Sequence, residues 1–152
     1  MNFHTGPATK AEIAQIAELE KIAFGEPCYP TFLFRQAYDL WPELLWCVRD
    51  EQQVLAYLLA APMLHQSKVF NIMSVAVAPA QQGRGVGKLL VSSFCQSQQQ
   101  KVDLFWLTVD PQNQSAQRLY QSLGFRVARY EDDYYHAGEA RLVMELDLTN
   151  KS

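Results

Sequence analysis

The chain has 152 residues, with 13 Lys and Arg against 16 Asp and Glu, so its formal net charge at pH 7 is -3. This length fits one domain with its own hydrophobic core and leaves little room for a second. No block of basic residues marks a general nucleic-acid surface, and no apolar stretch approaches the roughly 18 residues that a membrane span needs.

The three cysteines are widely spaced, at Cys28, Cys47 and Cys95. They form neither a CxxC pair nor a Cys/His group with zinc-ligand spacing. The amino terminus lacks the basic start and apolar run of a secretory signal. These features predict a cytoplasmic protein with reduced thiols and no metal.

The amino-terminal part is predicted to form an edge strand and two helices. Residues 2–6 suit the strand, and residues 9–12 have the spacing of a capping box before an apolar stripe that ends near Phe24. Residues 25–30 indicate a loop, and residues 31–40 a second helix. The aromatic side chains of this region either pack in the core or line a substrate pocket.

Three strands are expected next. Residues 44–49 and 54–61 are apolar runs joined by a polar turn at 50–53, which predicts an antiparallel hairpin closed by Pro62. Residues 68–77 are apolar on both faces and therefore suit a central strand.

The carboxy-terminal part is predicted to alternate helices and strands. A helix over residues 85–98 precedes a buried strand over 102–109, and a terminal strand pair covers 125–130 and 140–148. The first helix is expected to bury Val86, Leu89, Leu90 and Phe94. A second helix, capped by Asn113 and ended by Gly124, carries the stripe Ala116, Leu119, Tyr120 and Leu123.

A glycine-rich turn connects the central strand to the helix over residues 85–98. Gly83, Gly85 and Gly87 let a ligand approach the main chain, and the first N–H groups of a helix lack internal partners, so a phosphate is expected there. The spacing does not fit a P-loop, because Gln82 and Leu89 occupy two of its required positions, and it does not fit a dinucleotide fingerprint. A plain strand-to-helix turn is the alternative.

Two stretches together resemble a known family. Gln82-x-x-Gly85-x-Gly87 resembles the acyl-coenzyme A pyrophosphate loop of the GNAT N-acetyltransferases, and residues 113–125 are similar to the second signature of that family. Within the family, the chain most resembles bacterial ribosomal-protein alanine N-acetyltransferases. That likeness lies in Phe70-Asn71-Ile72, Trp106-Leu107, residues 119–125 and Tyr134-Tyr135.

The resemblance implies a fold, a reaction and an acceptor. The expected fold is a single α/β GNAT domain over residues 1–152, with a mixed, mostly antiparallel sheet of about seven strands and about four helices. The implied reaction moves the acetyl group of acetyl-CoA to a primary amine by direct attack. A protein or peptide N-terminal amine is the expected acceptor; a small amine or amino acid, or a non-catalytic acyl-CoA sensor, are the alternatives. Many relatives pair, so the resemblance also allows a homodimer.

The resemblance also assigns roles to residues. The backbone of the strand end would bond the pantetheine arm, through Val75, Ala76 and Val77. The pyrophosphate would lie on Gln82, Gly83, Arg84, Gly85, Val86, Gly87 and Lys88. Asn113 would bond the pantetheine or cap its helix, and Tyr120 would protonate the leaving thiolate or pack in the core.

The general base of the relatives has no counterpart at the matching positions. Thr108 stands where the ribosomal-protein enzymes carry glutamate, and Asn71 and Met73 stand where the arylalkylamine acetyltransferases carry histidines. An α-amine titrates near ~8, so such an acceptor is partly neutral and needs only a water path for its proton. The residues predicted to contact the acceptor or line that path are Glu26, Tyr29, Thr108 and Tyr134.

Overall fold

The computed structural model describes residues 2–149, which form seven strands and four α-helices. The strands are β1 (His4–Pro7), β2 (Leu45–Arg49), β3 (Val54–Met63), β4 (Gln66–Val77), β5 (Leu104–Val109), β6 (Arg126–Glu131) and β7 (Arg141–Asp147). The helices are α1 (Ile13–Phe24), α2 (Thr31–Leu40), α3 (Val86–Gln98) and α4 (Gln114–Ser122). Short 3-10 turns are η1 (Lys10–Glu12), η2 (Pro42–Leu44) and η3 (Pro79–Gln81).

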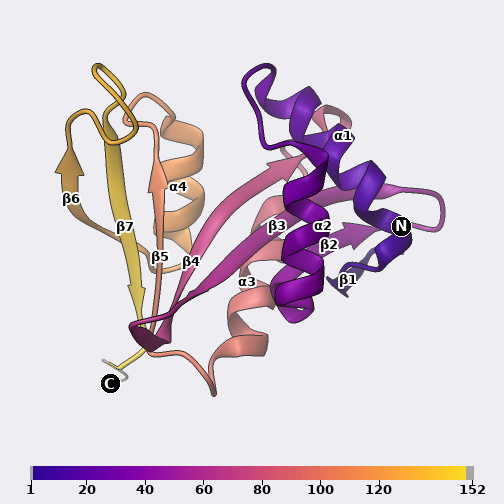
Figure 1. Ribbon diagram of the computed structural model, residues 1–152, viewed down its shortest axis with the longest axis horizontal. Coiled ribbons are helices and arrows are strands. Elements are labelled where there is room, and N and C mark those ends of the chain that lie inside the picture. The colour runs from indigo at the N-terminus through magenta and orange to yellow at the C-terminus, as the bar shows by residue number, and fades with distance from the viewer. Residues whose placement is uncertain (1, 150–152) are drawn as a thin grey trace. The chain divides into compact units, whose positions relative to one another are not determined.

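The strands follow the order β1-β2-β3-β4-β5-β7-β6 in a seven-stranded sheet (Figure 1). The pairs β1-β2, β2-β3, β5-β7 and β6-β7 are antiparallel, and β4 and β5 run parallel. The predicted α/β fold with a mixed, mostly antiparallel sheet is therefore confirmed, and β4 is the central strand as expected.

The chain forms two compact units. Unit 1 comprises the residues up to Ala61 together with Ser74–Ser97, and unit 2 comprises Pro62–Met73 together with the chain from Gln98 onward. Strand β4 contributes its first residues to unit 2 and its last residues to unit 1.

The core of unit 1 lies on both faces of the β2-β3 hairpin. Tyr57 pairs with Cys47 across the hairpin, so Trp46, the next residue along β2, points to the opposite face. The Tyr57 ring meets Phe34 of α2 edge-on at 5.3 Å, and the Trp46 ring meets Phe94 of α3 at 5.6 Å. Helices α2 and α3 therefore cover opposite faces of this hairpin (Figure 1).

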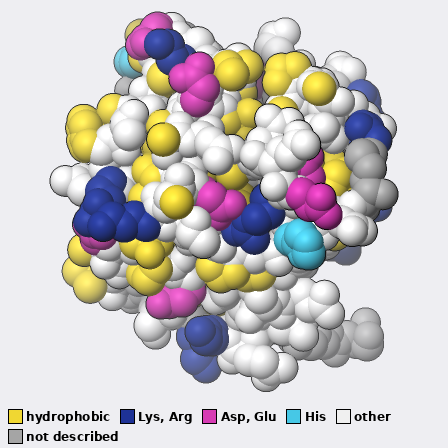
Figure 2. Space-filling view, turned by 90° about the vertical axis from the view of Figure 1, so that its right-hand side faces the viewer, with side chains coloured by type: hydrophobic (Ala, Val, Ile, Leu, Met, Phe, Trp, Pro, Cys, Tyr) yellow, Lys and Arg dark blue, Asp and Glu magenta, His cyan; other side chains and the backbone are white. Residues whose placement is uncertain are grey.

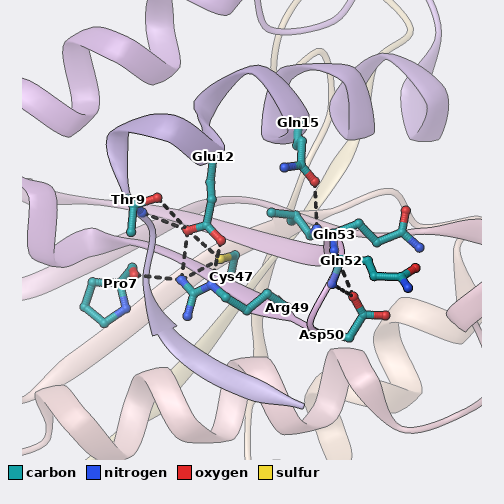
Figure 3. Close-up of polar contacts among 10 residues, drawn as sticks. Pro7, Thr9, Glu12, Gln15, Cys47, Arg49, Asp50, Gln52 and Gln53 are labelled. Atoms are coloured by element: carbon teal, nitrogen blue, oxygen red, sulfur yellow. Dashed lines mark hydrogen bonds and ion pairs between the residues drawn. The ribbon is translucent and has the colours of Figure 1, made fainter. Parts of the chain in front are cut away.

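The predicted capping box at the start of the first helix is confirmed. The Thr9 N–H donates to the Glu12 carboxylate at 2.9 Å, within the 3-10 turn that leads into α1. Arg49 of β2 donates to the same carboxylate from Nε at 2.6 Å and from Nη2 at 3.0 Å (Figure 3). Burial alone would raise the pKa of Glu12, but the hydrogen bonds from Arg49 and Thr9 and the charge of Arg49 outweigh it and hold the pKa below 4.5.

Two predictions are wrong, one about the end of a strand and one about a buried side chain. Pro62 does not close the hairpin strand, because β3 continues through it to Met63; the proline is exposed, where a missing N–H costs the ladder little. Leu89 is not buried in α3 but 38% exposed, since the helix buries the stripe formed by Val86, Leu90, Val91 and Phe94.

Unit 2 contains α4, the strands β5, β6 and β7 and the first part of β4. The apolar run over residues 102–109 predicts a strand buried throughout, but within β5 only Phe105, Leu107 and Val109 are buried, while Leu104, Trp106 and Thr108 on the other face are half-buried. Gly124 follows the end of α4 with a φ of +98°, and a Cβ there would lie 3.2 Å from the Leu146 side chain, so any other residue at this position would be strained.

Charged and apolar side chains are mixed on the face shown in Figure 2, where the Lys and Arg side chains lie in separate small groups among acidic ones. Within residues 2–149, no helix has both the length and the apolar character needed to cross a membrane.

Candidate active site

The glycine-rich turn between β4 and α3 has the backbone conformation that its glycines allow. Gly83 and Gly85 both have a φ of +79°, a region that other residues adopt at a cost. A Cβ at either position would meet nothing within 4 Å, so glycine serves the backbone conformation there and not tight packing. This glycine-rich segment leads directly into the 13-residue helix α3. The first N–H groups of a helix have no partners within it, so they can bind an anion.

The end of β4 leads directly into this turn. Ala76 is buried at 4% exposure, while Val75 and Val77 on the other face are half-buried. The strand end is tied back to β3 by the Ala78 N–H, which donates to the Leu55 carbonyl at 2.8 Å. The Gln82 side chain donates to the Val77 carbonyl at 3.4 Å, so the turn also folds back on the strand.

A buried carboxylate connects the loop over residues 25–30 to this strand. Glu20 of α1 is 3% exposed. Its Oε2 accepts the backbone N–H of Tyr29 at 2.9 Å, and its Oε1 accepts the hydroxyls of Tyr57 and, at 3.3 Å, of Ser74. Ser74 precedes Val75 on β4, so four elements of unit 1 meet at one carboxylate.

The sequence contained a signal for Glu20 that the prediction missed. The apolar stripe of the first helix includes Ile16 and Leu19, and Glu20 follows Ile16 by four residues, which places it on the same face. A charged residue on a core-facing stripe is buried at high cost unless it finds partners. A carboxylate on a buried helix face therefore indicates hydrogen-bond partners in the core, and Tyr57 of β3 and Ser74 of β4 are two of these partners.

The predicted acid, Tyr120, lies on α4 in unit 2. Its side chain is 8% exposed, and its ring meets Phe125 edge-on at 5.6 Å. Asn113, seven residues earlier, accepts the Ala116 N–H at 3.0 Å, so the capping role predicted for it is confirmed. A contact of Asn113 with a coenzyme stays a prediction.

The remaining predicted residues of unit 2 lie on separate elements. Thr108 of β5 is half-buried and pairs with Val143 of β7. Tyr134, in the loop between β6 and β7, lies 4.9 Å from the ring of Tyr135. Burial, with lesser effects from nearby side chains, raises the pKa of Tyr134, so this phenol stays protonated at neutral pH. No hydrogen bond links Thr108 with Tyr134 in the part of the chain that the structure describes.

An open groove of about 410 Å³ lies beside this loop. It is lined by residues 110–112, Tyr130 and residues 138–141, while Tyr134 and Thr108 are not among its walls. The groove is polar and carries both acidic and basic side chains.

The cysteines are not poised as nucleophiles. All three are free thiols. Burial raises the pKa of Cys47 to about 11 and that of Cys95 to about 12, and burial with the nearby acidic charges also raises the pKa of Cys28. Within residues 2–149, no group of three or more His, Cys, Asp or Glu side chains is arranged to hold a metal ion.

Residues 12–125 match the model of the acetyltransferase (GNAT) family. A curated relative, the [ribosomal protein bS18]-alanine N-acetyltransferase of Haemophilus ducreyi, is 31% identical over 87 residues. That alignment covers 57% of this chain and 58% of the relative, so the chain matches little more than half of the relative's length.

Solved structures have the same fold. The NatC complex bound to Gag peptide and CoA contains a chain with a TM-score of 0.86 and 23% identity, covering 97% of this chain and 99% of that one. The ribosomal-protein-S18-alanine N-acetyltransferase of Escherichia coli has a TM-score of 0.83 and 20% identity, covering 99% and 97%.

Proposed function

Because this chain belongs to the acetyltransferase (GNAT) family, we propose that it transfers the acetyl group of acetyl-CoA to a primary amine, with the N-terminal amine of a protein or peptide as acceptor. The observation that carries the proposal is the turn over residues 82–88. Two glycines with positive φ join the end of β4 to the start of α3 there, in the spacing of the coenzyme loop. A cytoplasmic location would accompany this activity.

The donor would bind to unit 1. The pyrophosphate would lie on the turn over residues 82–88, where the opening N–H groups of α3 and the side chains of Arg84 and Lys88 provide positive charge. The pantetheine arm would hydrogen-bond to the backbone of residues 75–77 in the manner of an added strand. We call residues 75–77 the donor strand.

The reaction would proceed by direct attack. The amine nitrogen attacks the thioester carbonyl carbon, the C–S bond breaks, and the acetyl group stays on nitrogen as an amide. The thiolate that leaves takes a proton from the Tyr120 hydroxyl. The amine gives its own proton to water, and water returns a proton to the Tyr120 oxygen. A backbone N–H of the donor strand would stabilise the oxyanion that forms on the carbonyl.

The acceptor would lie against the loop over residues 25–30, which we call the acceptor loop; the contact expected from Tyr134 stays a prediction. Glu26 is exposed in that loop and carries the charge that attracts an ammonium group. With Thr108 in place of a glutamate base, an α-amine is a better acceptor than a lysine side chain, because its lower pKa near ~8 leaves more of it neutral.

The experiment is a panel of acceptors with acetyl-CoA, measured by release of free thiol. Peptides with free N-termini should give turnover, while the same peptides with blocked N-termini and an internal lysine should not. Turnover with small amines but not with peptides would show that the acceptor is a small amine. Binding of acetyl-CoA without thiol release on any acceptor would establish the sensor alternative.

A further inference from the structure

We infer that Glu20 is a positioning residue that fixes the acceptor loop (residues 25–30) to the donor strand (residues 75–77), and this inference rests on the proposed function. Glu20 was not among the residues predicted from the sequence. Its carboxylate hydrogen-bonds both to the acceptor loop and to the residue before the donor strand, and so it connects these two segments of unit 1 in the core.

Burying the Glu20 carboxylate in the core costs free energy unless it finds hydrogen-bond partners. Glu20 is 3% exposed, and a buried charge is stable only when hydrogen bonds replace its water. The three partners described for it are neutral donors: one backbone N–H and two hydroxyls. Removing the carboxylate would take away the acceptor that the Tyr29 N–H and the two hydroxyls share, so the carboxylate holds these three groups in place.

The three donors belong to the two proposed binding segments and to the core strand β3. The Tyr29 N–H is part of the acceptor loop, and Ser74 is the residue before the donor strand. Tyr57 joins them from β3, because its hydroxyl lies 2.7 Å from that of Ser74 as well as against Glu20. Burial and the bond to Glu20 raise the pKa of Tyr57, so its hydroxyl stays protonated and available to donate.

Aromatic rings make a second connection between the acceptor loop and the core. The Tyr29 ring meets Phe34 edge-on at 6.4 Å, and Phe34 meets Tyr57 at 5.3 Å. Phe34 and Tyr57 are fully buried. The acceptor loop is therefore held to the core both by its backbone, through Glu20, and by the side chain of Tyr29, so its position relative to the donor strand is fixed within unit 1.

The test compares two substitutions of Glu20. Glu20→Met keeps the length of the side chain but has no acceptor, and it should raise the KM for the peptide acceptor about tenfold while the KM for acetyl-CoA changes less than about twofold. Glu20→Gln should restore the acceptor KM to within about threefold of the wild type, because its carbonyl can accept from Tyr29 while its amide donates to Tyr57. Failure of Glu20→Gln to restore the KM would show that the charge, not the position, matters, and would overturn the inference.

Glu12→Met is the matched control. Glu12 is also a carboxylate of unit 1 that accepts several hydrogen bonds, but its partners are Thr9, Cys47 and Arg49 and not the acceptor loop (Figure 3). It should lower the melting temperature without changing the acceptor KM. An equal rise of the acceptor KM in both variants would mean a loss of stability only and would contradict the inference.

Amide hydrogen exchange gives a readout that does not need activity. The Tyr29 amide should exchange at least about tenfold faster in Glu20→Met than in the wild type, and its exchange rate should be unchanged in Glu12→Met.

Ser74→Ala is the substitute variant if Glu20→Met does not fold. It should raise the acceptor KM about threefold; an unchanged KM would overturn the inference. If the wild type acetylates no acceptor, the proposed function fails, and unchanged exchange of Tyr29 in Glu20→Met would separately refute the positioning role.

Discussion

At the scale of single residues, the proposed reaction gives Tyr120 the role of proton donor. It is buried on α4 against Phe125, which suits a core residue as well as an acid. The two roles differ in what the hydroxyl does, because the ring fills the same space with or without it. Removing the oxygen alone therefore separates packing from proton transfer.

Tyr120→Phe should lower kcat at least about tenfold, because the leaving thiolate loses its proton donor, while the Kd for acetyl-CoA stays within about twofold. Steady-state kinetics and calorimetric titration measure the two quantities. Tyr130→Phe is the control, since Tyr130 is a 56% exposed tyrosine of the same unit. Unchanged turnover in Tyr120→Phe would leave Tyr120 a packing residue.

The ion pair of Glu12 with Arg49 makes stability depend on pH. Because the folded pKa of Glu12 is held below its ordinary 4.5, the pair stabilises the fold fully above that value. This contribution disappears as the pH falls through the lowered folded pKa. Urea unfolding should show Glu12→Gln to be about 1 kcal/mol less stable than the wild type at pH 7, with the difference shrinking below about pH 4.5. A difference that stays constant down to pH 3 would contradict this account.

At the scale of elements, the turn between β4 and α3 makes a matched comparison available. Gly85 and Gly138 both have positive φ, of +79° and +84°, and a Cβ at either position would meet nothing within 4 Å. The backbone penalty of a substitution is therefore similar at the two sites. Only Gly85 lies in the proposed coenzyme loop.

Gly85→Val should weaken CoA binding at least about tenfold, since the side chain projects where the pyrophosphate would approach the main chain. Gly138→Val should leave the Kd for CoA unchanged while lowering stability by about 1–2 kcal/mol, as Gly85→Val also does. Calorimetric titration with CoA and thermal unfolding measure both. Retained affinity in Gly85→Val would exclude this turn as the pyrophosphate site.

Elements were easier to foresee than the contacts between them. Apolar periodicity predicts the four α-helices and the strands β2 to β7 to within a few residues, because it reflects which face each element buries. It placed Leu89 wrongly, since the i+3 position of α3 lies at the edge of the buried stripe. The position of Glu20 on the apolar stripe of α1 signals a buried carboxylate, but periodicity does not identify its partners. Tyr29, Tyr57 and Ser74 come from three other segments that only the folded chain brings together.

At the scale of the whole molecule, coenzyme binding and folding are linked. A ligand that binds only the folded chain stabilises it by about 2.7 kcal/mol at a hundred times its Kd. The melting temperature should therefore rise with CoA concentration and continue to rise beyond saturation of the site. Adenosine at the same concentrations should give a smaller rise, because it lacks the pyrophosphate. An equal rise with both compounds would show that the proposed phosphate site contributes nothing.

The cysteines have a practical consequence at this scale. Cys28 is half-buried in the acceptor loop, while Cys47 and Cys95 are buried in the core. A maleimide fluorophore near pH 8 should therefore attach to one thiol per folded chain, and to all three once the chain is unfolded. The native sequence thus carries its own attachment point for a dye in the loop where the acceptor would dock. Changes in emission on addition of a peptide would report that docking in real time, without an engineered cysteine.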